Sequence, residues 1–312
     1  MCDWRMAAAK RAEGELGREL VAAHWESETS LYRLIPEFIP RPVAFGTYKS
    51  RLDRHFFLLE FVDMIADDIP DAESYVAPVA ALLLRSMGKS PNGMFGFSVE
   101  TKFGDLPQPT DWEASWAVWW TKHMRFVVDR EERIRGPHTA EDTKLVHDYL
   151  DVVLPRYLRP LETSGRSIQP TLCHGEMWPG NVKYKDDGKS VVIYDANACW
   201  YHNEVELAPL RNPRYPLGES YIEEYWKRIP PSEPEKGADS RIVMYMIRNQ
   251  VQLASLYPGE KGLRDAFLGS MRLLVDRVLE ETESLGTVRA SAIRGEEKIR
   301  VANLENQDVI HV

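Results

Sequence analysis

The hydrophobic pattern of the N-terminal third predicts one long helix followed by two strands. The helix is expected over residues 6–35, where apolar side chains recur at helical spacing and prolines follow at positions 36 and 40. The apolar positions are Leu16, Leu20, Ala23, Leu31 and Leu34. Residues 43–48 and 55–62 are rich in the β-branched and aromatic side chains typical of strands.

The rest of the chain reads as mostly helical, interrupted by one long loop and one hairpin. Helical spacing predicts helices over residues 71–87, 111–135, 142–161, 218–228, 240–257 and 263–285. Glycine and proline mark residues 90–109 as a long loop. Residues 182–185 and 190–194 alternate like strands around the turn 186–189, which predicts a hairpin. Beyond residue 286 the pattern is weak, so we expect a loosely held tail.

Composition places the chain among water-soluble globular proteins. Its 312 residues carry a net charge of −9 and are 44% hydrophobic, so neither nucleic acid nor a membrane is expected as a partner. The apolar run 76–84 is too short to span a bilayer and contains Pro78. Three cysteines, Cys2, Cys173 and Cys199, form no disulfide framework, which favours a reducing, cytoplasmic location. No sequence feature fixes the oligomeric state.

The residues with the clearest chemistry lie on either side of the predicted hairpin. The carboxylate Glu176 is followed five residues later by the amide Asn181, and Asp195 stands fourteen residues beyond that. The hairpin would bring Asp195 back beside Asn181. A carboxylate that meets a substrate hydroxyl, with an amide and a second carboxylate that hold Mg²⁺ on nucleotide phosphates, is the equipment of a kinase loop. We therefore expect ATP and Mg²⁺ as cofactors, with Glu176 as the catalytic base.

A connection between the strands and the helical part falls at residues 60–63. In a two-lobed kinase, backbone groups of such a segment bind the adenine ring, so Glu60, Phe61 and Val62 are candidate nucleotide-binding residues. The alternative is a buried strand that leads into a loop. Lys10 and Lys49 are not assigned to the phosphates, because neither lies in a convincing strand.

The aromatic and histidine residues near the loop have less specific roles. Trp178 either stacks on a sugar-like substrate or braces the loop. His174 is expected to be structural, bridging the loop backbone as a buried imidazole. The tryptophans at 112, 116, 119 and 120 are expected to pack in the core. Cys173 and Cys199 should lie close together as buried thiols.

These motifs resemble the fructosamine kinase (ketosamine-3-kinase) family, within the group that includes the aminoglycoside phosphotransferases. The family's loop reads roughly His-Gly-Asp-Leu-Trp-x-Gly-Asn, and residues 174–181 read His-Gly-Glu-Met-Trp-Pro-Gly-Asn. The family's apolar-Tyr-Asp segment is matched at residues 193–195, and its Tyr-x-His-x-Glu region is approximated at residues 200–204. The resemblance covers roughly residues 20–275 and is closest to the fungal branch.

The resemblance implies an α+β, two-lobed protein-kinase-like fold with a reduced N-lobe and a mostly helical C-lobe. The corresponding ranges are 1–62, 63–285 and a tail at 286–312. The implied activity is ATP-dependent phosphorylation of a ketosamine hydroxyl, either in a small molecule or on a glycated protein lysine. Two alternatives stay open: a kinase for another small hydroxylated or amino-sugar compound, and a non-catalytic, kinase-like binding protein.

Three departures from the family favour the non-catalytic alternative. Glu176 replaces the family's Asp, the glycine-rich loop and strand lysine of the N-lobe are not recognisable, and His24 stands where the helix glutamate that pairs with that lysine is expected. The N-lobe is therefore expected to be truncated relative to the family. Asn181 and Asp195 support the enzyme, because both serve only to hold the metal-nucleotide.

Overall fold

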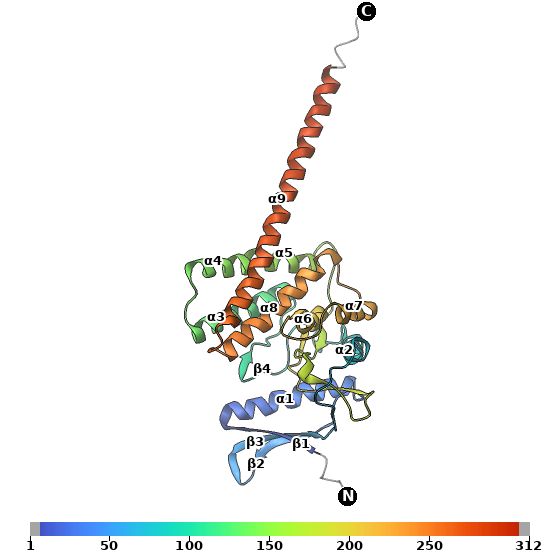
Figure 1. Ribbon diagram of the computed structural model, residues 1–312, viewed down its shortest axis with the longest axis vertical. Helices are drawn as coiled ribbons and strands as arrows, with labels where there is room; N and C mark the ends of the chain where they lie inside the picture. The colour runs from blue at the N-terminus through green and yellow to red at the C-terminus, as the bar shows by residue number, and fades with distance from the viewer. Residues whose placement is uncertain (1–6, 306–312) are drawn as a thin grey trace, which may run out of the picture.

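A computed structural model describes the backbone of residues 7–305 and the side chains of residues 10–283. A small β-sheet covered by one helix lies at one end of the molecule, and a larger helical part lies beyond that helix (Figure 1). Within the described residues, no helix is both long enough and apolar enough to cross a membrane.

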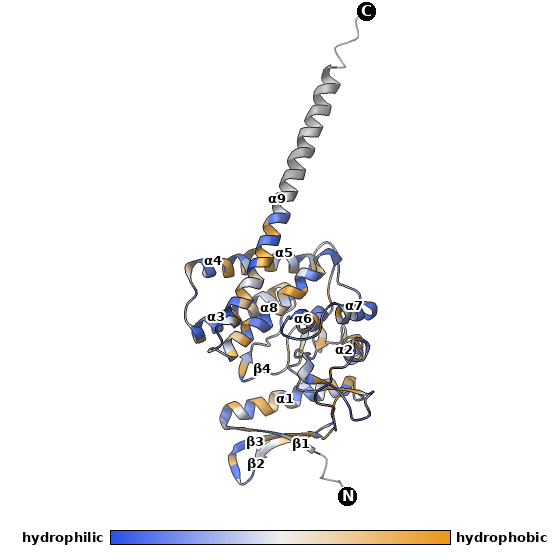
Figure 2. Cartoon of the chain, viewed as in Figure 1, coloured by the Kyte–Doolittle hydropathy of each residue, from blue (hydrophilic) through white to orange (hydrophobic). Residues whose placement is uncertain are grey.

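The N-lobe is a three-stranded antiparallel sheet backed by one helix. The strands β1 (Ala7–Glu13) and β2 (Pro42–Tyr48) pair on either side of β3 (Arg51–Glu60). Helix α1 (Gly14–Leu34) packs on this sheet, and its Val21 joins Phe57 and Leu59 in a small core. Polar and apolar residues alternate along α1 (Figure 2), as expected for a helix with one packed face and one exposed face.

The prediction of a single helix from residue 6 was wrong at its start. Residues 7–13 form β1, and Gly14, with a φ of +70°, separates the strand from α1. Alanine, arginine and glutamate favour a helix locally, but pairing with β3 outweighs that preference. Gly17 lets the strand and the helix approach closely, since a Cβ there would lie 2.8 Å from the Ala12 carbonyl carbon.

The C-lobe is a bundle of helices around the buried helix α8 (Ala238–Leu256). Its other α-helices are α2 (Ala72–Ser86), α3 (Trp116–Arg135), α4 (Ala140–Asp148), α5 (Leu154–Leu158), α6 (Ala208–Arg211), α7 (Glu219–Arg228) and α9 (Gly262–Glu305). Trp116 and Trp120 of α3 are buried against Tyr245 of α8, and the Trp116 indole N–H donates to the Tyr245 hydroxyl. The prediction that the tryptophans at 116, 119 and 120 pack in the core is confirmed, while Trp112 is only partly buried.

Most of the other predicted elements agree with the structure, with local exceptions. Helices α2, α7, α8 and the start of α9 occur where they were predicted. The loop 90–109 contains a short hairpin, β4 (Thr101–Phe103) with β5 (Leu106–Gln108). The predicted helix at 111 begins only at Trp116, because Ser115 caps it and Glu162 accepts hydrogen bonds from its first amides. The domain limits at 62 and 285 remain predictions, and residues 306–312 lie outside the described chain.

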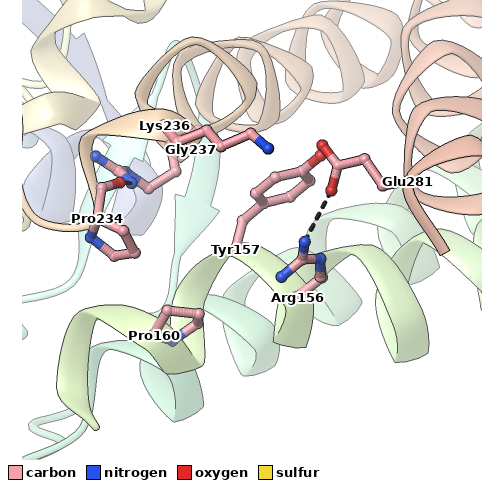
Figure 3. A pocket seen from close by; sticks show the side chains of 8 residues that line it. Arg156, Tyr157, Pro160, Pro234, Lys236, Gly237 and Glu281 are labelled. Atoms are coloured by element: carbon pink, nitrogen blue, oxygen red, sulfur yellow. Dashed lines mark hydrogen bonds and ion pairs between the residues drawn. The ribbon is translucent and has the colours of Figure 1, made fainter. Parts of the chain in front are cut away.

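Ion pairs attach α9 to the rest of the bundle. Arg264 of α9 binds the buried carboxylate of Glu131 in α3, and Glu281 binds Arg156 of α5 (Figure 3). A cavity of about 130 Å³ lies beside the second pair, bounded by Tyr157 and Lys236 (Figure 3). None of the predicted catalytic residues lines it.

A fully buried ion pair holds the segment after the hairpin against α8. The 3₁₀ turn Asn203–Leu207 carries Glu204, which forms two hydrogen bonds with Arg241 at 2.6 and 2.7 Å. Both side chains are about 99% buried or more, and Glu204 also accepts from the Ser232 amide at 2.8 Å. Because both charges are desolvated, either one would be costly to leave alone.

We expect Arg241→Met to destabilise the protein by about 3–5 kcal/mol, because it leaves Glu204 buried without a countercharge. Urea denaturation followed by circular dichroism measures the change. The double variant Glu204→Gln/Arg241→Met removes both charges and should recover most of the loss. A single variant that is as stable as the wild type would show that the pair is not energetically coupled.

Candidate active site

The predicted hairpin brings Asp195 beside Asn181. Strands β7 (Val182–Tyr184) and β8 (Val191–Ile193) pair antiparallel, and the Tyr194 amide donates to the Asn181 carbonyl at 3.2 Å. The strands before and after the hairpin region, β6 (Thr171–Cys173) and β9 (Cys199–Tyr201), also pair antiparallel. This pairing sets Cys173 opposite Cys199. The expected closeness of the two thiols is confirmed, and both are buried.

Asn181 lies in the 3₁₀ turn Pro179–Asn181 and is held by the loop backbone. Its side-chain nitrogen donates to the Glu176 carbonyl at 3.0 Å and to the Asp195 carbonyl at 3.5 Å. Because both partners are carbonyl oxygens, which can only accept, the two bonds identify the nitrogen end of the Asn181 side-chain amide. The amide oxygen takes part in neither bond and remains an acceptor for a cation.

Asp195 sits in a strained backbone conformation between two basic side chains. Its φ of +65° is rare for a residue with a side chain. The Lys10 ammonium donates to Asp195 Oδ1, and His24 Nδ1 lies 3.5 Å from the same oxygen. Burial raises the pKa of Asp195, but Lys10 and His24 outweigh it and hold the pKa below its usual value. The carboxylate is therefore ionised.

The structure corrects the expectation for Lys10. The sequence pattern placed it in a helix and gave it no role, but it lies in β1 with its ammonium at Asp195. The reason is the same pairing with β3 that overrides the local helix preference. His24, which stands where the helix glutamate was expected, projects from α1 to the same carboxylate and stacks on Phe57. Burial and Lys10 lower the pKa of His24 to about 4, so it is neutral at pH 7.

Glu176 is partly buried, and its enclosed Oε1 has no hydrogen-bond partner among the described residues. Burial raises its pKa to about 8, Arg248 opposes that rise, and Asp195 adds to it. A carboxyl group with such a pKa is poised to exchange a proton near neutral pH. Burial is thus the main reason that the Glu176 carboxyl holds a proton to a higher pH than usual.

The backbone directly before Glu176 is held on both sides by buried charged side chains. The Gly175 amide donates to Glu206 Oε1 at 2.8 Å, and Arg248 donates to the Gly175 carbonyl at 3.3 Å. Gly175 has a φ of +82°, and a Cβ there would lie 2.3 Å from the Asn197 carbonyl oxygen. Glycine is therefore required, and the position of the Glu176 backbone is fixed.

His174 bridges the loop, as the sequence predicted. It is fully buried, its Nε2 lies 3.1 Å from the Tyr194 carbonyl, and the Glu176 amide donates to its Nδ1 at 3.3 Å. Burial lowers its pKa to about 4, so the neutral ring donates from Nε2 and accepts at Nδ1. The imidazole connects the start of the loop to the strand that precedes Asp195.

Helix α1 is bound directly to the segment after Asp195. The Ala196 amide donates to Glu28 Oε1 at 3.0 Å, and the Ala198 amide donates to the Ser27 hydroxyl at 3.3 Å. Both side chains are at least 99% buried. Sequence reasoning missed them. The available signal was two polar residues at positions of α1 that face the protein interior.

The predicted catalytic and metal-binding residues line one cavity of about 310 Å³ between the lobes. Glu176, Asn181 and Asp195 share its wall with Lys10 and His24. The substrate-facing candidate Trp178 is 38% exposed there, and its ring stacks on Tyr215 at 5.9 Å between centroids. The remaining lining residues are Lys102, Phe103, Gly104, Ala196, Asn197, Arg214, Leu253, Leu256 and Tyr257.

The predicted adenine-binding segment does not line this cavity. Strand β3 ends at Glu60, whose amide donates to the Arg41 carbonyl, and the Phe61 side chain is 42% exposed. The chain leaves β-geometry at Phe61 and crosses toward the C-lobe through Val62. A role for these three residues in nucleotide binding remains a prediction.

Comparison with known proteins identifies the fold as kinase-like. A solved fructosamine-3-kinase homologue from Haemophilus somnus aligns with a TM-score of 0.66 at 18% identity, covering 88% of this chain and 83% of that one. A thermostable aminoglycoside phosphotransferase aligns with a TM-score of 0.56 at 14% identity, with 87% of each chain covered. At these identities the likeness shows the fold alone, and that fold is the one predicted from the sequence.

The fructosamine kinase family model matches residues 16–266, so the chain belongs to this family. Mouse ketosamine-3-kinase is 29% identical over 154 residues, which are 49% of this chain and 45% of the mouse protein. The chloroplastic protein-ribulosamine 3-kinase of Oryza sativa subsp. indica is 26% identical over 251 residues, which are 79% of this chain and 67% of the rice protein. The match to the mouse relative thus spans about half of that protein.

The buried carboxyl of Glu206 gives the stability of the protein a specific pH dependence. Burial raises its pKa from 4.5 to about 7, so the folded state keeps a proton that the unfolded state releases. Its contribution to stability is present below pH 4.5 and is lost as the pH rises through about 7, by at most about 3 kcal/mol.

We expect Glu206→Gln to raise the melting temperature by several degrees at pH 8 and not at pH 5. Glutamine keeps an oxygen that accepts from the Gly175 amide. Differential scanning calorimetry at the two pH values measures the effect. An equal gain in melting temperature at pH 5 and pH 8 would show that the effect comes from packing and not from the burial of charge.

Proposed function

We propose that this protein is an ATP-dependent phosphotransferase that acts on a ketosamine. The observation that carries the proposal is the convergence of Glu176, Asn181 and Asp195 on one cavity together with Lys10. Phosphoryl transfer depends on position and charge stabilisation, and these four side chains are the types it needs. Membership of the fructosamine kinase family supports the ketosamine as acceptor, because the relatives carry names of ketosamine and ribulosamine kinases.

The donor set fits Mg²⁺ held on nucleotide phosphates. Asn181 keeps a free amide oxygen and Asp195 is an ionised carboxylate, and Mg²⁺ prefers hard oxygen ligands with several waters retained. No cluster of three or more acidic, cysteine or histidine side chains forms a separate metal site in the described part of the chain. Mg²⁺ would neutralise charge on the phosphates, and Asn181 and Asp195 would hold it there.

Lys10 and Glu176 would have two further roles, phosphate binding and proton acceptance. Lys10, released from Asp195 by the bound metal, would bind phosphate oxygens. Glu176 would accept the proton of the acceptor hydroxyl, for which it must be ionised, and Arg248 favours that form. Glu60, Phe61 and Val62 would contact the adenine. Trp178 with Tyr215 would provide an aromatic surface for the sugar. We place the protein in the cytoplasm, where ATP and reduced thiols are available.

Nucleotide binding is expected to depend on Mg²⁺ and on Asp195. Calorimetric titration with ATP should show binding with Mg²⁺, and Asp195→Ala should weaken it about tenfold or more, the scale of losing a metal-site contact. Asp186→Ala, an exposed carboxylate in the same hairpin, is the matched control and should bind as wild type does. Folded wild-type protein that binds no nucleotide would overturn the proposed function.

Transfer is expected to depend on the charge of Glu176. Glu176→Gln keeps the size of the side chain but cannot accept the proton, so kcat should fall by about 10²- to 10⁴-fold while Mg·ATP still binds. A coupled assay of ADP release with a ketosamine acceptor measures kcat. An unchanged kcat in this variant would exclude Glu176 as the base.

The second candidate is a non-catalytic kinase-like protein. The observation that favours it is the pair of departures at the site: Glu176 is one methylene longer than the family's Asp, and His24 stands on α1 where a carboxylate was expected. A displacement of about 1 Å can cost on the order of 10²-fold in rate. Mg-dependent nucleotide binding without transfer to any hydroxylated acceptor would select this candidate.

A further inference from the structure

The cavity is also lined by an exposed basic side chain without a countercharge. Arg214 lines the cavity, and its guanidinium makes no hydrogen bond or ion pair with any side chain or carbonyl among residues 10–283. The two lysines of the cavity are paired, Lys10 with Asp195 and Lys102 with Glu19 and Glu100, and His24 also lies at Asp195. Arg214 is thus left to bind an anionic group of a ligand.

The backbone places Arg214 and Tyr215 by a defined turn. Asn212 is buried, its side-chain oxygen accepts from the Arg214 amide at 3.0 Å, and its carbonyl accepts from the Tyr215 amide at 3.1 Å. Tyr215 in turn stacks on Trp178, two residues after the base. The turn therefore fixes the backbone from which the Arg214 side chain reaches the cavity.

Glu176, Arg214 and Tyr215 line the same cavity. Burial raises the pKa of Tyr215, the Glu176 carboxyl raises it further, and the Arg214 guanidinium lowers it, so both charged groups are near the phenol. A ligand on the Trp178–Tyr215 surface would therefore share one cavity with both the base and the guanidinium. Arginine binds carboxylates through two parallel hydrogen bonds, which gives both charge and geometric selectivity.

We propose that the acceptor is a small ketosamine formed from a free amino acid, with its carboxylate bound by Arg214 and a sugar hydroxyl at Glu176. This inference rests on the proposed function and names the substrate class for the same cavity. In such a compound five bonds separate the third sugar carbon from the carboxylate carbon, a span of roughly 6 Å when the chain is extended at about 1.2 Å per bond. The ketosamine of a lysine side chain within a protein has no carboxylate at that position.

The test compares two acceptors that differ only in charge: the ketosamine of alanine and the ketosamine of alaninamide. The measured quantity is the ratio of their kcat/KM values, for wild type, Arg214→Ala and Arg214→Lys. Wild type should prefer the carboxylate about tenfold, the scale of a charge-assisted hydrogen bond at a partly open site. Arg214→Ala should remove the preference, and Arg214→Lys should restore part of it.

The matched control is Arg33→Ala, which removes an exposed α1 arginine that does not line this cavity. It should leave the ratio at the wild-type value. Equal use of both acceptors by wild type would overturn the inference while leaving the proposed function intact. So would a rise in the KM for ATP in Arg214→Ala with the ratio unchanged, because Arg214 would then bind nucleotide.

A catalytically slow protein does not prevent the test. Calorimetric binding of the two ketosamines in the presence of Mg²⁺ and a non-hydrolysable ATP analogue gives the same ratio from dissociation constants. A carboxylate preference that disappears in Arg214→Ala supports the inference even where no phosphate is transferred. Failure of wild type to bind either ketosamine would overturn both the inference and the ketosamine assignment.

Discussion

The hydrogen bonds between α1 and the segment after Asp195 are the constraint on which the site depends. Glu28 and Ser27 hold the amides of Ala196 and Ala198 directly beyond Asp195, whose own backbone is strained. Lys10 enters from β1, the strand that feeds into α1. The position of Asp195, the proposed metal ligand, is thus set by the N-lobe as much as by the hairpin. A shift of α1 would move Lys10 and Asp195 together.

Burial is the second physical theme of the site. Glu28 and Glu206 are buried and Glu176 is partly buried, and desolvation raises the pKa of each, to about 7 for Glu28 and Glu206 and about 8 for Glu176. Arg248 is the basic group that opposes this for Glu176 and Glu206, while it also holds the Gly175 carbonyl. One arginine of α8 thereby influences both the placement of the catalytic loop and the charge of its base. Such strained, desolvated groups reduce stability and are typical of sites that bind charged ligands.

The sequence predicted the hairpin and the closeness of Asn181 and Asp195 because their spacing is local. Asn181 and Asp195 are joined by a hairpin of short strands, and a turn at residues 186–189 with alternating flanks is enough to place them side by side. The family resemblance gave the two-lobed fold. The prediction for the N-lobe was wrong at β1. Its seven residues have a helical composition and form a strand only because they pair with β3, more than forty residues away. Lys10 was misjudged for that reason, and no local pattern marks such a long-range contact.

The substitution of Glu176 for Asp is best understood together with its surroundings. Both backbone groups of the preceding Gly175 are fixed, by Glu206 and Arg248, so the loop has little freedom to retreat from the longer side chain. The extra methylene must then be absorbed by the side-chain torsions or by the ligand. Because Glu176 Oε1 has no hydrogen-bond partner among the described residues, that oxygen is left free to bind a ligand. An acceptor anchored at a distance by Arg214 could adjust its hydroxyl to that carboxylate, which would make the two features parts of one binding arrangement.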